Sequence, residues 1–175
     1  MTDHFPIAMI WVTHIEPPYI APTLNNPGLE SVYGLTKRRY PGITQETTVD
    51  VVEEIYRADY WDAHKCGDLP PAIGLALFDA LMISRPGTAV RFLRLALNLL
   101  PCGAVDDSVI QAARSADIAE TLLEINTLRA EHCHHMVVAD SSTAHIFRPR
   151  FKRLLALTAY IHDSGLVAHQ QEQNA

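Results

Sequence analysis

The chain has 175 residues, enough for one domain with a sizeable core, and 48% of them are apolar while only 7% are aromatic. This composition, with long Leu, Ala and Val runs, favours an all-α globular protein over a β-sandwich or a disordered chain. The net charge of −6 gives no general attraction to nucleic acid, which we exclude as a partner. Three widely spaced cysteines do not make a disulfide framework.

We expect one domain over residues 1–165, followed by a polar C-terminal tail over residues 166–175. No stretch reaches the roughly 18 apolar residues of a transmembrane helix, and the first 20 residues lack the cationic region and cleavage site of a signal peptide. The sequence therefore predicts a protein without a membrane span, made in the cytoplasm, for which any export needs a separate route.

Residues 5–15 are apolar on most faces and predict a buried helix that ends on Glu16. Pro17 and Pro18 follow at once and stop the helix, because a residue before proline is pushed out of the α region. A carboxylate at the mouth of an apolar helix, next to a polar turn, is in surroundings that favour the protonated acid. Glu16 is therefore our candidate general acid, as in glycosidases, and the alternative is a solvated carboxylate at a helix end.

Residues 20–42 are dense in proline, glycine and asparagine, which predicts a shaped loop or small β-hairpin region in an otherwise helical chain. Within it, residues 31–36 have the composition of a short strand. Lys37, Arg38 and Arg39 form the one dense cationic cluster. It is either a solvated loop or a contact for an acidic polymer.

Helical periodicity predicts the remaining elements, with boundaries set by turn formers and N-caps. We expect helices from residue 47 or 48 to 61, over 71–84, over 88–100, from about 106 to 114, from about 116 to 139, and over 146–163. Asp79 is the one charged residue of the second of these helices, and it needs either a structural partner or a role in a site. His132 and His135 share a helix face, but without a third ligand nearby we predict no metal site and no cofactor.

Several motifs, in this order, resemble one family. Glu16-Pro17-Pro18-Tyr19 matches the position of a helix-ending E-G-G-Y motif, and residues 26–36 match a turn of the form D-P-G-G-x-T-x-Y/F-G-I-T. Residues 55–62 resemble I-Y-x-x-Y-W-D, and residues 69–79 resemble L-P-x-x-V-A-x-x-x-F-D. These are motifs of glycoside hydrolase family 108, the phage-type N-acetylmuramidases of the secretion-activator and endolysin group, and the resemblance covers roughly residues 7–163.

The resemblance implies a mainly helical, lysozyme-like fold and cleavage of the peptidoglycan glycan strand after N-acetylmuramic acid, in phage lysis or entry or in opening the wall for secretion. It implies Glu16 as general acid and Ser31 as a group that orients the attacking water or the hydrogen-bond partner of that water. The substrate-binding residues that it implies are Tyr19, Asn26, Tyr33, Trp61 and Asp79. A peptidoglycan hydrolase acts in the periplasm or cell wall, so export would depend on a holin or a secretion system.

The sequence also departs from the family pattern. Pro17 and Pro18 replace two glycines, Asn26 replaces an acidic residue and Ile83 replaces an asparagine. An asparagine cannot be a carboxylate nucleophile or a general base, so a second carboxylate must come from elsewhere, with Glu30, Asp62 and Asp79 as candidates. The alternative to an enzyme is therefore a catalytically impaired muramidase-like module that binds peptidoglycan or a protein partner.

Overall fold

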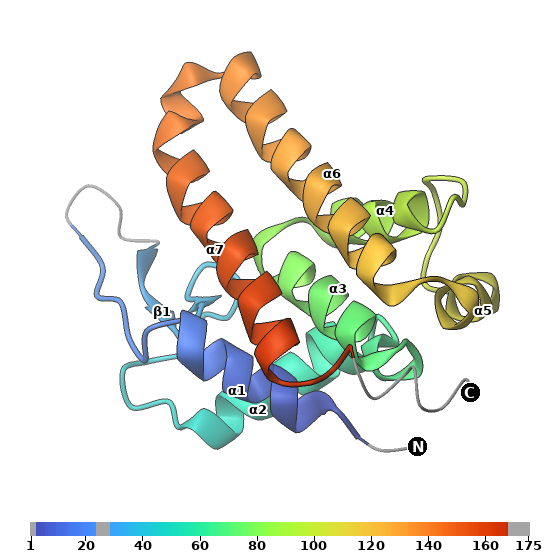
Figure 1. Cartoon of the computed structure of the whole chain (residues 1–175). Helices are drawn as coiled ribbons and strands as arrows, with labels where there is room; N and C mark the ends of the chain where they lie inside the picture. The colour runs from blue at the N-terminus through green and yellow to red at the C-terminus, as the bar shows by residue number, and fades with distance from the viewer. Residues whose placement is uncertain (1–2, 24–28, 168–175) are drawn as a thin grey trace. The chain divides into compact units, whose positions relative to one another are not determined.

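The structure is a computed structural model that describes residues 3–23 and 29–167 (Figure 1). Within these ranges it has seven α-helices and one two-stranded sheet, so the predicted mainly α fold is confirmed. The internal contacts of the chain group into two compact units, Met1–Ala63 and His64–Ala175.

The first unit begins with α1 (Phe5–Ile15), the predicted apolar helix. Its N-cap is His4, and the Asp3 carboxylate accepts a hydrogen bond from the Phe5 amide at 3.0 Å. The helix ends at Glu16, whose backbone is extended (φ −105°, ψ 133°), as expected for a residue that precedes proline.

The predicted strand over residues 31–36 is in fact a hairpin. β1 (Ser31–Val32) pairs antiparallel with β2 (Leu35–Thr36), and Val32 lies opposite Leu35. The two residues between the strands, Tyr33 and Gly34, have φ of 45° and 83°, as in the type I′ turns that suit tight hairpins. Ile20 adds an antiparallel bridge to Ser31 on the other side of β1.

The first unit closes with α2 (Val49–Tyr56), which continues into the π-helical segment η2 (Arg57–Asp62). The predicted helix is therefore present, but its last part has wider turns than an α-helix. Arg57 ties η2 to the start of the chain, since its guanidinium lies 2.9 Å from Asp3 Oδ2 and 4.1 Å from the centre of the Phe5 ring.

The second unit is built on α3 (Pro71–Ile83), after the short 3₁₀ turn η3 (Cys66–Asp68). Every residue of α3 from Ala72 to Leu81 is buried, as the prediction of a central helix requires. The other elements are α4 (Pro86–Ala96), α5 (Asp107–Ser115), α6 (Ile118–Ala139), η4 (Ser141–Thr143) and α7 (Ala144–Asp163). Figure 1 shows α6 and α7 as an antiparallel pair, and α3 and α4 both pack against α6.

The helix ends follow local chemistry. Asp106 and Asp117 cap α5 and α6, and each carboxylate accepts a hydrogen bond from a backbone N–H of the first turn. α4 ends at Ala96, before the predicted residue 100, because Asn98 adopts a left-handed conformation (φ 56°) and the Leu99 amide turns back to the Arg94 carbonyl.

Leu166, the first residue of the predicted polar tail, is buried. Among the described residues, no helix combines the length and the apolar character needed to cross a membrane.

Candidate active site

Glu16 is half-buried at the end of α1, where its amide donates to the Val12 carbonyl at 2.9 Å. The next residues run along the hairpin. The Tyr33 amide donates to the Pro18 carbonyl at 3.3 Å, and the Ile20 amide donates to the Ser31 carbonyl at 2.9 Å. This pairing holds the backbone at Pro18 and Ile20 against the hairpin, which brings the end of α1 close to it.

Gly34 is where the Glu16 side chain meets the hairpin turn. A Cβ built on Gly34 would lie 2.9 Å from Glu16 Cδ and 3.0 Å from both Glu16 Cγ and Tyr56 Oη. These separations are shorter than ordinary van der Waals contacts of a Cβ atom, so a side chain at position 34 would displace Glu16 or Tyr56. The positive φ of Gly34 requires glycine for a second, independent reason.

Tyr56, the last residue of α2, contacts the same turn. Its hydroxyl donates to the Tyr33 carbonyl at 2.8 Å, and its ring lies 5.0 Å from that of Tyr60. Glu16, the Tyr33–Gly34 turn and Tyr56 therefore form one packed cluster inside the first unit. From the sequence, Tyr56 is predicted in a helix but not in the site. The available signal was that a tyrosine on the buried face of a helix needs a partner for its hydroxyl.

Ser31 and Tyr33 belong to this hairpin. Ser31 is 5% exposed, in β1, and Tyr33 is half-buried in the turn. Two of the predicted site residues thus lie on the element that contacts Glu16.

Tyr19 lies beside the hairpin in a charged group with Glu30 and Lys37. The Tyr19 hydroxyl is 3.5 Å from Glu30 Oε1, and Lys37 Nζ is 2.8 Å from Glu30 Oε2. Desolvation and the Glu30 carboxylate raise the pKa of Tyr19, and the hydrogen bond to Glu30 raises the pKa of Lys37. Both groups therefore keep their protons at neutral pH, and Glu30 has a cationic partner.

The cationic cluster of residues 37–39 is largely engaged within the unit. Lys37 pairs with Glu30, and the Arg39 guanidinium lies 4.6 Å from the centre of the Tyr60 ring and 5.5 Å from that of Tyr40. Arg38 is exposed.

Trp61 and Asp79 occupy packed positions. Trp61 is 3% exposed, with its ring edge-to-face on Phe5 at 5.6 Å. Asp79 is fully buried in the second unit, where Arg153 Nε donates to Oδ1 at 2.7 Å and Arg129 Nη2 donates to Oδ2. These surroundings favour a structural role for both residues over contact with substrate.

Of the other predicted residues, Asp62 and His132 are described by the structure, and Asn26 lies outside the described residues. Asp62, a candidate second carboxylate, is exposed at the end of η2. His132 packs on Phe92 with ring centres 5.5 Å apart, and no group of three or more His, Cys, Asp or Glu side chains in residues 3–23 and 29–167 is placed to hold a metal ion.

Comparison with known proteins relates part of the chain to a glycosyl hydrolase family. The model of a family described as Glycosyl hydrolase 108 matches residues 20–84, which confirms the resemblance read from the motifs over that segment. Glu16 lies before the first matched residue. A search of curated proteins finds no match.

Solved structures give the fold. The structure described as that of Brucella abortus SagA is similar with a TM-score of 0.66 and 23% sequence identity, and the alignment covers 87% of this chain and 94% of the other. The two chains therefore share a fold along most of their lengths.

Proposed function

We propose that this protein is a peptidoglycan hydrolase of the N-acetylmuramidase type, with Glu16 as its general acid. The observation that carries the proposal is the packing of the Glu16 carboxyl group on the Gly34 turn, where the Tyr56 hydroxyl also lies close to Gly34 and donates to the Tyr33 carbonyl. A general acid must be held in one position relative to the bond that it protonates. The match of residues 20–84 to a glycosyl hydrolase family supports the reaction class.

In this mechanism the Glu16 carboxyl group donates its proton to the glycosidic oxygen as the bond to the sugar breaks. An ionised carboxylate must then stabilise the oxocarbenium-like centre or activate water. Glu30 is our candidate within the first unit, because its pairing with Lys37 supplies a counter-charge to the ionised form. Ser31, on the same hairpin, would orient the attacking water.

Purified murein tests this proposal. The wild type should reduce the turbidity of a murein suspension, and Glu16→Gln should not, because a carboxamide is too weak an acid to protonate the leaving oxygen. The matched control is Glu54→Gln, which changes an exposed carboxylate of α2 in the same unit and should keep full activity. A Glu16→Gln variant as active as Glu54→Gln would remove Glu16 from the mechanism.

The second candidate function is that of a muramidase-like module that binds peptidoglycan or a protein partner without cutting it. It is favoured by the two exposed prolines, Pro17 and Pro18, that directly follow Glu16 where the family has glycines. Proline is stiffer and keeps a ligand farther from the backbone than glycine does. A wild type that sediments with insoluble murein but never lowers its turbidity would support this function and contradict hydrolysis.

We further propose that the protein reaches the periplasm or cell wall through a holin or a secretion system. Expression of the chain alone in the cytoplasm should then leave cells intact, while the same chain fused to an export signal should lyse them. Lysis without an export signal would contradict this route.

A further inference from the structure

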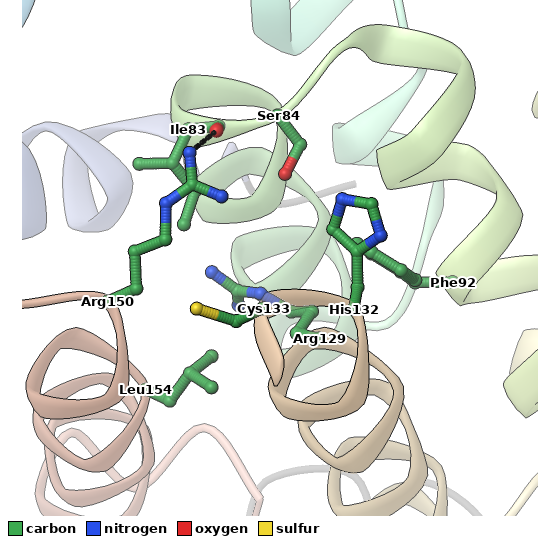
Figure 2. A pocket seen from close by; sticks show the side chains of 8 residues that line it. All are labelled: Ile83, Ser84, Phe92, Arg129, His132, Cys133, Arg150 and Leu154. Carbon is green, nitrogen blue, oxygen red and sulfur yellow. Dashed lines mark hydrogen bonds between the residues drawn. The ribbon is translucent and has the colours of Figure 1, made fainter. Parts of the chain in front are cut away.

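A small pocket opens in the second unit between α3, α4, α6 and α7, far along the chain from Glu16. Figure 2 shows the polar groups that line it: the guanidinium groups of Arg129 and Arg150, the imidazole of His132 and the hydroxyl of Ser84. Leu154 and Phe92 supply apolar walls. The cavity volume is about 10 Å³, counted as the space open to the centre of a water-sized sphere. Such a cavity holds one small group, such as a water-sized atom or a monatomic ion.

Arg129 brings an unsatisfied donor to this pocket. Its side chain is 3% exposed, and Nη2 is bound to Asp79. Nη1 is buried and has no hydrogen-bond acceptor among the residues that the structure describes. Figure 2 shows the guanidinium turned into the space between Arg150 and His132. A buried, charged donor without an acceptor is costly, so this position favours a ligand that accepts hydrogen bonds.

Positive charge exceeds negative charge around the pocket. The Asp79 carboxylate is shared by two buried guanidinium groups, those of Arg129 and Arg153. Arg150 donates to neutral acceptors, the Ile83 carbonyl oxygen and the Met136 sulfur, and no ion pair of Arg150 is present in the described part of the chain. The Asp79 carboxylate is thus shared by two arginines, and Arg150 adds a third positive charge at the pocket.

The pKa of His132 reflects the same excess of positive charge. Burial lowers the pKa of His132 first, and the positive charges of Arg150, Arg91 and His135 lower it further. The groups that act on this ring therefore come from α4, α6 and α7, and all of those charges are positive.

We propose that this pocket is a binding site for a small anion, with Arg129 Nη1, the Arg150 guanidinium and the Ser84 hydroxyl as donors. The occupant is a chloride-sized ion or a single oxygen of a carboxylate or phosphate. It neutralises charge at the junction of four helices, so it stabilises the second unit, and it does so independently of the chemistry at Glu16.

Bromide is the probe, and the full chain is used throughout. The thermal unfolding midpoint is measured in increasing sodium bromide and in sodium gluconate at matched ionic strength, since gluconate is too large for the pocket. We expect a saturable rise in bromide alone. Arg150→Gln leaves the Arg129–Asp79 contact in place and should weaken the apparent bromide affinity about tenfold or more, the loss expected for one charge-assisted hydrogen bond. Arg148→Gln, an exposed arginine on the same helix, should bind like the wild type.

A second measurement needs no variant. An anion beside the ring favours the imidazolium, so bromide should raise the pKa of His132, followed by NMR, relative to gluconate. Competition by acetate or phosphate would assign the site to an oxyanion, and failure of both to displace bromide would assign it to halides. Equal unfolding midpoints in bromide and gluconate, together with an unchanged His132 titration, would overturn the proposal.

Discussion

Replacing Gly34 by alanine perturbs the contact between the hairpin turn and Glu16 most directly. The new Cβ would meet Glu16 Cδ at 2.9 Å and Tyr56 Oη at 3.0 Å, so both side chains must move. A left-handed backbone costs a residue with a side chain about 1–2 kcal/mol, and loss of the hydrogen bond from Tyr56 to Tyr33 adds about 0.5–1.5 kcal/mol. The expected destabilisation is about 1.5–3.5 kcal/mol.

Thermal unfolding followed by circular dichroism measures this change, and for a chain of this length the midpoint should fall by roughly 3 to 14 °C. Murein turbidity, measured well below the midpoint, should show a further loss of activity because the Glu16 carboxyl group is displaced. The matched control is Gly42→Ala in the same unit, where a Cβ would meet nothing within 4 Å. If Gly34→Ala unfolded at the same temperature as Gly42→Ala and retained its activity, the packing of Glu16 on this turn would not matter.

Three further substitutions test the contacts described above. Asp79→Asn should lower the free energy of unfolding by about 3–5 kcal/mol, because it leaves two buried guanidinium groups without a counter-ion. The control Asp163→Asn changes an exposed carboxylate and should alter that free energy little. Urea titration measures both. Tyr56→Phe should cost about 1 kcal/mol by removing the hydrogen bond to Tyr33, and its murein activity should fall while its circular dichroism spectrum stays unchanged. Asp106 has a pKa lowered to about 2 by the neighbouring serine hydroxyl, the Val109 amide and an arginine, so its stabilising contribution should be complete above about pH 4 and disappear as the pH falls toward 2. In Asp106→Asn the urea midpoint of unfolding should depend less on pH over that range than in the wild type. An equal dependence on pH in the two proteins would contradict the assignment.

The sequence predicted those parts of the fold that depend on neighbours along the chain. The aspartates at 106 and 117 mark helix starts because a carboxylate caps the amides two or three residues ahead. Pro17 ends α1 for a similarly local reason. The π-helical turn over Arg57–Asp62 was not predictable, because a one-residue widening barely changes the periodicity of so short a segment.

The site was predictable in part. The motifs placed Glu16 at a helix end and Gly34 in a turn, but the contact between them joins residues 18 positions apart, which local patterns do not determine. Asp79 needed a buried partner, yet its two arginines lie 50 and 74 residues further along the chain. Trp61 illustrates the same limit, since a motif gives a residue type and a position but not whether the ring faces solvent or the core.

The measurement that tests the central claim most directly is the reducing end of the murein fragments that the wild type releases, identified by mass spectrometry after borohydride reduction. We predict reduced N-acetylmuramic acid at every new end, and no new ends with Glu16→Gln. Reduced N-acetylglucosamine, or the same fragments from the Gln variant, would contradict a muramidase that depends on Glu16.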